Sequence, residues 1–190
     1  DVRLKHCRHG LFLYPAREAI GQALDLFGEW DEQCVTLFDL LLRRGDTVLD
    51  VGAHIGTYTV YFARRVGPSG RVLAIEPQRL VHQLLNANVA LNALDNVWTR
   101  HAAAGARETE GDMVSLGHFE AIEAGMFSLK NFQFRTGRLT RFSESVEMLS
   151  VDGLFESEAK AGRGGVPGGT AGTTVGVRVG ASGEAGGEAG

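Results

Sequence analysis

The chain has 190 residues, a formal net charge of −4 at pH 7, 26 glycines and two cysteines. This length favours one domain. The weakly acidic balance gives no electrostatic reason to expect nucleic acid or an anionic membrane as a partner. No apolar run is long enough for a transmembrane helix and no signal peptide is visible. Two cysteines are too few for a disulfide framework, which favours a reducing compartment and a cytoplasmic location.

The first part of the chain predicts two helices. Residues 17–27 carry apolar side chains at helical spacing, and a second apolar stripe runs from Val35 to Leu42 behind Asp31, a suitable N-cap. Two arginines and Gly45 then end the second helix. We therefore expect residues 1–45 to be a helical lead-in. Because the chain opens on Asp1 rather than Met, we expect a fragment or a processed product.

The middle of the chain alternates β and helical patterns. Strand patterns alternating with helical ones at these lengths predict a parallel α/β sheet with right-handed crossovers. The predicted strands are residues 47–51, 71–75 and 96–102, and the predicted helices are residues 56–66 and 78–94. We assign residues 46–155 to this domain.

The last third has weaker patterns. Residues 105–125 are polar and unpatterned, residues 127–134 suggest a hairpin or irregular β region, and residues 146–151 suggest a short strand. Residues 156–190 are predicted to be a disordered tail, because 12 glycines fall in the last 30 residues and large apolar groups are few. One exception is open: residues 173–179 alternate and could form a weak edge strand, although Gly176 interrupts them.

The most informative motif is the turn after the first predicted strand of the sheet, which reads Asp50-x-Gly52-x-x-x-Gly56. Glycine permits a tight turn and close approach of a ligand to the backbone. A dinucleotide fingerprint would be G-x-G-x-x-G, in which the middle glycine makes room for a pyrophosphate. His54 stands at that position here and would crowd a diphosphate. The turn therefore favours S-adenosylmethionine, which has no phosphate and gains from an acid such as Asp50.

A second acid supports a nucleoside ligand. Glu76 ends the next predicted strand, 20 residues after Gly56. A carboxylate at this position of a βαβ unit can accept hydrogen bonds from ribose hydroxyls. Either feature alone has an ordinary structural explanation, as a plain turn or a solvated acid. Together, at this spacing, they predict a nucleoside site.

Several segments together resemble the FkbM family of S-adenosylmethionine-dependent methyltransferases over roughly residues 6–154. They are Arg8-His-Gly10 with Leu13-Tyr-Pro15, Phe27-Gly-Glu-Trp30, Gly45-Asp46, Asp50-Val-Gly-Ala-His-Ile-Gly56, Val66-Gly-Pro-Ser-Gly-Arg71, Glu76-Pro-Gln78, Asn88 with Leu91-Asn92, Asn96-Val97 and Ala102-Ala-Ala-Gly105. The resemblance implies a Rossmann-like class I methyltransferase fold, α/β, with a parallel sheet and flanking helices.

The resemblance also implies the cofactor, S-adenosyl-L-methionine, and the residues that hold it. Asp50, Gly52, Ala53, His54 and Gly56 would frame its methionine end. The ribose would be held by Glu76, and the adenine would lie near Pro77 and Gln78. No catalytic residue and no metal site is assigned, and Trp30 is either a packing anchor or a cap on the cofactor pocket.

Two departures from the family pattern matter. The position of His54 is usually Asn in the family, and His can still donate one hydrogen bond. The fourth parallel strand, which ends in an Ile-Asp-Val-Glu-Gly type motif, is missing, because the sequence changes character near Glu156. We expect a fold that is incomplete at the C-terminal side, through truncation, a wrong reading frame or a mispredicted exon, and a first strand with one unpaired edge.

Three functions are weighed. The resemblance implies O-methylation of a small-molecule or sugar-like hydroxyl, with no nucleic acid and no membrane as partner. The alternative is an inactive nucleoside-binding remnant, or a partner subunit that lacks the acceptor half. A nicotinamide-dependent oxidoreductase is the third, which the glycine spacing disfavours. The acceptor and the oligomeric state are not fixed by the sequence.

Overall fold

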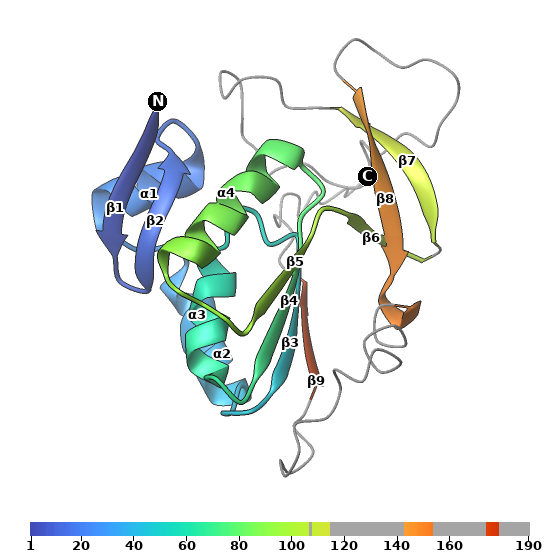
Figure 1. Ribbon diagram of the computed structural model, residues 1–190. Helices are drawn as coiled ribbons and strands as arrows, with labels where there is room; N and C mark the ends of the chain where they lie inside the picture. Colours follow the sequence, from blue (N-terminus) through green and yellow to red (C-terminus); the bar gives the residue numbers. More distant parts are fainter. Residues whose placement is uncertain (107, 115–142, 154–173, 179–190) are drawn as a thin grey trace, which may run out of the picture.

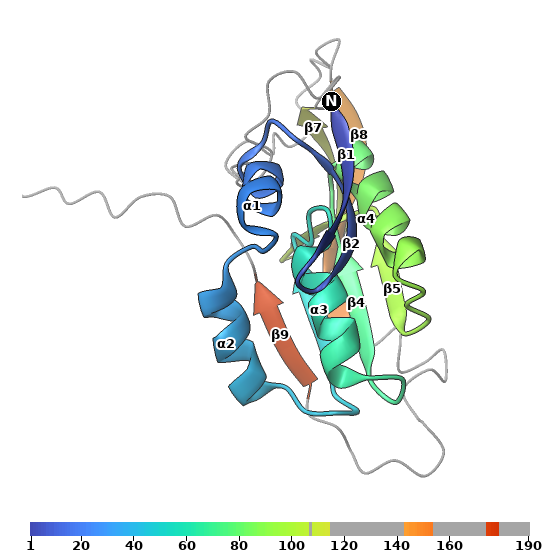
Figure 2. The ribbon, with the colours of Figure 1, turned by 90° about the vertical axis from the view of Figure 1, so that its left-hand side faces the viewer.

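A computed structural model describes residues 1–106, 108–114, 143–153 and 174–178. Its central element is a parallel sheet of four strands in the order β5-β4-β3-β9 (Figure 1). The helices α2, α3 and α4 lie on one face of that sheet in both views (Figures 1 and 2). The bounds are β3 Thr47–Val51, β4 Arg71–Ile75, β5 Val97–Arg100, β9 Thr174–Arg178, α2 Glu32–Leu41, α3 Thr57–Val66 and α4 Arg79–Leu91.

The two strands at the centre of the site have the bounds that the sequence predicts. Both β3 and β4 consist largely of buried residues, as expected for parallel strands that are covered on both faces. The predicted helices begin and end within a few residues of α1 (Ala19–Phe27), α2, α3 and α4. One end differs: α2 stops at Leu41 and its C-cap Leu42 is extended, whereas Gly45, with φ of 90°, serves the turn that follows.

The main hydrophobic core lies between the helices and the sheet. Aromatic side chains of α2 and α3 pack edge to face or stacked, with Phe38 and Phe62 at 5.0 Å between ring centroids. Asp31 begins α2 as predicted, and its side chain accepts from the backbone N–H of Cys34. It also accepts from the Tyr58 hydroxyl at 2.6 Å, which joins the start of α2 to α3.

The edge of β3 is paired, which corrects our expectation of an unpaired first strand. Residues Thr174–Arg178 form β9 and pair in parallel with the whole of β3, from Thr47 to Val51. The segment that the alternating pattern left open is therefore a strand, within a region predicted to be a disordered tail. The sequence prediction judged residues 173–179 alone and did not consider their pairing with β3. The preference of a segment for a strand depends strongly on the strands beside it.

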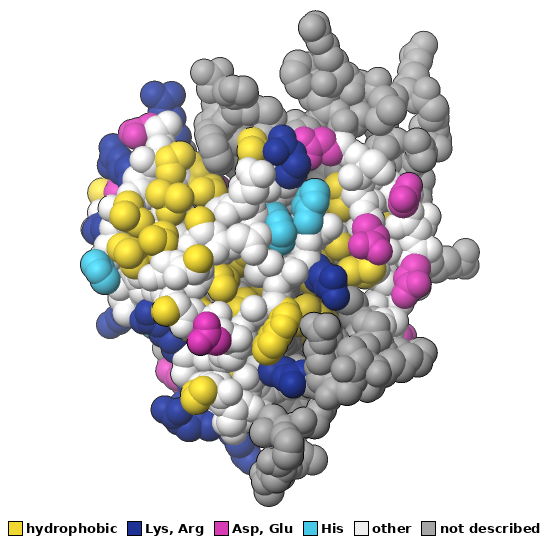
Figure 3. Space-filling view, viewed as in Figure 1, with side chains coloured by type: hydrophobic (Ala, Val, Ile, Leu, Met, Phe, Trp, Pro, Cys, Tyr) yellow, Lys and Arg dark blue, Asp and Glu magenta, His cyan; other side chains and the backbone are white. Residues whose placement is uncertain are grey.

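The N-terminus differs from the predicted helical lead-in. Strands β1 (Val2–Cys7) and β2 (Gly10–Pro15) form an antiparallel hairpin ahead of α1. Its inner face carries Phe12 and Tyr14, both nearly fully buried among residues of α1, α3 and α4. Its outer face carries apolar side chains, including Val2 and Leu4, which gather over the hairpin in Figure 3. The alternation of β2 is hidden because both of its faces are apolar, whereas the short alternation of Val2-Arg-Leu-Lys5 in β1 was overlooked.

Two asparagines attach the hairpin to α4. Asn88 is fully buried; its side chain accepts from the Leu13 N–H at 2.7 Å and donates to the Leu13 carbonyl at 3.0 Å and the Ile55 carbonyl at 2.8 Å. One helical turn later, Asn92 makes the same pair of bonds with Leu11, at 3.0 and 2.7 Å. The two amides therefore satisfy the backbone of β2 where a third strand would otherwise pair.

A second sheet covers part of the other face of the main one. It has the order β6-β8-β7, with β6 Ala103–Gly105, β7 Thr109–Val114 and β8 Ser143–Ser150. Leu149 of β8 packs against a cluster that includes Leu49 and Ile75 of the main sheet. The strand predicted at residues 146–151 thus overlaps β8, which begins earlier and ends at Ser150, and β7 lies in the segment predicted to be unpatterned. The suggested β region at residues 127–134 lies outside the described residues.

Candidate functional site

The turn between β3 and α3 lies where the carboxyl ends of β3 and β4 meet. Gly52, His54 and Gly56 all have positive φ, at 79°, 53° and 89°. The N–H groups of Gly52 and Ala53 both donate to the Ile75 carbonyl, at 2.9 and 3.0 Å, which fixes the turn against the end of β4. Glycine is suited to such φ values, and histidine tolerates them only at a cost.

Gly56 has a second requirement besides its φ. A Cβ added there would lie 2.6 Å from Cδ1 of Leu85 on α4. Gly56 is also the N-cap of α3, and its carbonyl accepts from Val60 at 2.9 Å. The helix therefore approaches the turn closely, and its first N–H groups face the edge of the sheet where ligands bind in open α/β folds.

Asp50 is a buried acid near the end of β3. Its side chain has no exposed surface, and its Oδ2 accepts from the Thr59 hydroxyl of α3. Within the described part of the chain, Oδ1 is buried and has no hydrogen-bond partner. Burial raises the pKa of Asp50 to about 7, against the lowering effect of the Thr59 hydrogen bond, and the nearby Glu76 raises it further. An unpartnered buried carboxylate oxygen is costly and marks a position where a cation or donor would be stabilised.

Glu76 follows β4 and is also buried. Its two oxygens are held separately: Oε2 accepts from the backbone N–H of His54 at 2.9 Å, and Oε1 from the backbone N–H of Gln78 at 2.8 Å. Burial raises its pKa, an effect that His54 and the two backbone donors oppose. Each carboxylate oxygen can accept more than one hydrogen bond, so both retain capacity for a further donor.

His54 joins this cluster to a residue that the sequence prediction missed. Its Nε2 lies 3.1 Å from Oε2 of Glu18, and both side chains are largely buried. Nε2 of His54 is therefore within ion-pair distance of Glu18 but without hydrogen-bond geometry, and neither ring nitrogen has a hydrogen-bond partner among residues the structure describes. Glu18 precedes α1 and reads in the sequence as a surface acid at a helix start. Only the docking of the N-terminal segment brings it to the turn, and no local pattern predicts that.

Pro77 and Gln78 continue from Glu76 into α4. Gln78 is buried and is the N-cap of α4. The Pro77 carbonyl lies 3.0 Å from Nε2 of His101, which follows β5. The structure therefore brings all eight predicted residues to the ends of β3 and β4 and the turns that follow them, at one edge of the sheet, and His101 joins them from the end of β5.

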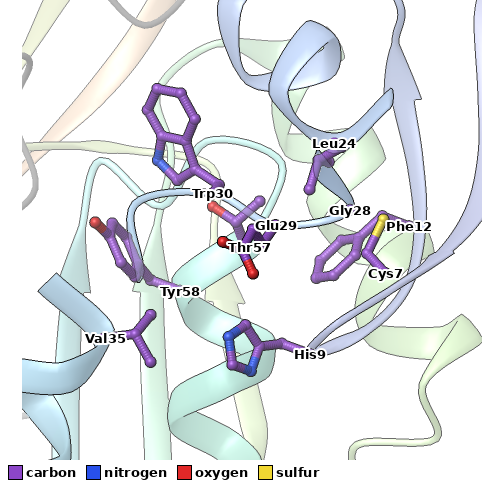
Figure 4. Close-up of a pocket in the computed structure, with 10 residues that line it drawn as sticks. All are labelled: Cys7, His9, Phe12, Leu24, Gly28, Glu29, Trp30, Val35, Thr57 and Tyr58. Carbon is purple, nitrogen blue, oxygen red and sulfur yellow. The ribbon is translucent and has the colours of Figure 1, made fainter. Parts of the chain in front are cut away.

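A small pocket lies beside the start of α3, between the hairpin and the link from α1 to α2 (Figure 4). Trp30 lines it and also packs against both large hydrophobic clusters, which favours its interpretation as a packing anchor. The ten lining residues are Cys7, His9, Phe12, Leu24, Gly28, Glu29, Trp30, Val35, Thr57 and Tyr58.

The histidines and cysteine near the N-terminus do not converge. His6 and Cys7 are neighbours on β1, so their side chains point to opposite faces of the hairpin. His9 lies 2.6 Å from Glu32. In the described ranges, no group of three or more His, Cys, Asp or Glu side chains could hold a metal ion. Among the same residues, no helix has the length and apolar character needed to cross a membrane.

The parallel sheet, its helices and the buried acids at its carboxyl edge define a Rossmann-like α/β protein of the class I methyltransferase type. A family model described as the methyltransferase FkbM domain matches residues 50–163, more than half of the chain. The chain belongs to this family of S-adenosylmethionine-dependent methyltransferases, which confirms the resemblance drawn from its motifs.

The other comparisons are partial. The chain is 42% identical over 60 residues to the 23S rRNA (uracil(1939)-C(5))-methyltransferase RlmD of Acinetobacter baylyi, a match that covers 31% of this chain and 13% of that protein. A putative rRNA-methylase from Clostridium thermocellum is 25% identical over 38% of this chain and 39% of its own, with a TM-score of 0.37. A SAM dependent methyltransferase from Aquifex aeolicus is 32% identical over 46% of this chain and 44% of its own, also at 0.37.

Proposed function

We propose that this chain binds S-adenosylmethionine at the carboxyl edge of β3 and β4 and transfers its methyl group to the hydroxyl of a small molecule or sugar. The observation that carries the proposal is the pair of buried acids, Asp50 and Glu76, at the ends of neighbouring parallel strands. They flank a glycine turn at the start of a helix, and one of them has a buried oxygen without a partner in the described structure.

The charge of the site fits a cationic ligand. Burial raises the pKa of both acids, so each loses stabilisation when it ionises. S-adenosylmethionine has a sulfonium and an ammonium group, and a cation beside Asp50 would offset that cost. A diphosphate would instead bring negative charge toward two carboxylates. His54 would also occupy the space that a dinucleotide site leaves to glycine, which supports the choice of ligand.

Roles follow for the remaining residues. Glu76, held by two backbone N–H groups, would accept hydrogen bonds from the ribose hydroxyls on its free lone pairs. Gly52, Ala53, His54 and Gly56 would form the wall along the methionine end. Pro77 and Gln78, at the start of α4, would border the adenine.

When bound, the cofactor would supply a methyl group on a positively charged sulfur; transfer to a hydroxyl oxygen would leave a neutral thioether and release the hydroxyl proton to water. The chain would position the two reactants and exclude water, and both effects contribute strongly to the rate of a two-substrate reaction. We name no general base. A small hydroxyl acceptor is preferred to RNA because the formal net charge is −4, and RNA binding relies on basic surfaces.

The first test is binding. Calorimetry should detect S-adenosylmethionine on the purified chain and no binding of NAD. Glu76→Gln should weaken the binding of S-adenosylmethionine by at least about tenfold. The amide nitrogen of glutamine cannot accept a hydrogen bond, so one backbone N–H and one ribose hydroxyl would lose their acceptor. Glu29→Gln is the matched control: Glu29 pairs with Arg8 on the surface. Unchanged affinity in Glu76→Gln would exclude this site.

The second test separates the enzyme from an inactive nucleoside-binding remnant or partner subunit. Transfer of a labelled methyl group to small hydroxyl compounds, to sugars or to ribosomal RNA would be measured in parallel. Label in a hydroxyl compound supports the proposal, and label in RNA alone would overturn the acceptor class. Binding without transfer to any acceptor class would favour the remnant. A cytoplasmic location remains a proposal, supported by the free thiols of Cys7 and Cys34.

A further inference from the structure

Glu18 is a buried acid that neither the fold nor the cofactor roles above explain. It is 5% exposed and occupies the N-cap position of α1, yet its side chain makes no capping hydrogen bond. A carboxylate is rarely buried without a compensating group. The group it faces is the imidazole of His54, at 3.1 Å. The N-terminal segment thus places a charged side chain against the glycine turn.

His54 is an unusual residue for its backbone position. Its φ is 53°, in the left-handed region, where asparagine is more readily accommodated. The backbone N–H of this same residue donates to Glu76 at 2.9 Å. The orientation of the peptide at residue 54 therefore determines where one oxygen of Glu76 lies, and a displaced turn would displace that carboxylate.

We propose that Glu18 is a positioning residue: by holding the His54 imidazole it fixes the left-handed turn, and through the N–H of residue 54 it sets the Glu76 carboxylate for the ribose. In this proposal Glu18 acts through His54 rather than by binding the ligand itself. This inference rests on the proposed function, since it presumes that Glu76 binds ribose hydroxyls.

Replacement of His54 by asparagine should remove the need for Glu18. Asparagine at position 54 would adopt the left-handed conformation without needing a charged partner. The contribution of Glu18 to ligand binding should then disappear in a His54→Asn background. A merely structural role of Glu18, for example in packing α1, would persist in that background.

The experiment measures adenosine against 2′-deoxyadenosine, which differ only in one ribose hydroxyl, by calorimetry on the full chain. Wild type should prefer adenosine by about tenfold, the scale of one hydrogen bond to a charged group. Glu18→Gln should reduce this preference to about twofold or less. The double variant Glu18→Gln/His54→Asn should match His54→Asn alone, and the control Glu29→Gln should match wild type.

The outcomes distinguish the two levels of the hypothesis. If wild type binds neither nucleoside nor S-adenosylmethionine, the proposed function fails. If wild type discriminates and Glu76→Gln does not, but Glu18→Gln retains the full preference, only the role of Glu18 is refuted. An equal effect of Glu18→Gln in the wild-type and His54→Asn backgrounds also refutes it. If thermal melting shows that Glu18→Gln is not folded at the temperature of the binding assay, Glu18→Asp is used in its place, with the same expected results.

Discussion

Replacement of Asp50 by asparagine should change how stability depends on pH. The pKa of Asp50 is about 7 in the folded chain and 3.8 when unperturbed. The folded state therefore retains a proton that the unfolded state has already lost between these values, so its stability falls as pH rises through that window. About three pH units at about 1.4 kcal/mol each correspond to a loss of about 4 kcal/mol.

An asparagine side chain has the same shape as an aspartate and does not titrate, so Asp50→Asn should escape this loss. Urea unfolding of both proteins from about pH 4 to about pH 8 should show the variant gaining about 4 kcal/mol relative to wild type. Thr59→Val gives a matched check: without the hydroxyl that lowers the pKa of Asp50, the loss should extend to higher pH. A difference between wild type and Asp50→Asn that stays flat within about 0.5 kcal/mol would refute the reasoning.

Three further predictions concern the residues and the strand that support the site. Asn88→Ala should lower the free energy of unfolding by about 3 kcal/mol, one for each lost hydrogen bond, whereas Gln83→Ala on the exposed side of α4 should cost under about 0.5; equal urea midpoints would contradict this. Gly56→Ala should cost about 1–3 kcal/mol, because its Cβ would meet Leu85 at a φ of 89°; an unchanged melting temperature would count against it. Removal of residues 173–190 should expose the edge of β3 and cause association, measured by light scattering, and a monodisperse, equally stable product would refute the role of β9.

Local patterns predicted the centre of the fold well. The strands Thr47–Val51 and Arg71–Ile75 are largely apolar, and the turn after the first has a distinctive spacing of acid and glycines. Nearly everything needed to place Asp50 and Glu76 at one edge of the sheet therefore lies within about 30 adjacent residues. Their roles toward the cofactor remain predictions.

The elements that sequence reasoning missed depend on distant partners. The hairpin of β1 and β2 is held by Asn88 and Asn92, about 75–81 residues away. Strand β9 depends on β3, and the contact of Glu18 with His54 exists only after the N-terminal segment docks. Such pairings have no local periodicity, so composition alone favoured a helical lead-in and a disordered tail instead.

The spacing of the two asparagines on α4 has a geometric consequence. Four residues of helix advance about 6.0 Å, and two residues of strand advance about 6.6–6.8 Å. Asn88 and Asn92 therefore match Leu13 and Leu11 with a mismatch of under about 1 Å. A third amide at the same interval would double that error, to roughly half a hydrogen-bond length. The helix spacing and the strand spacing therefore agree over one interval only. This explains why α4 binds β2 through a single pair of amides.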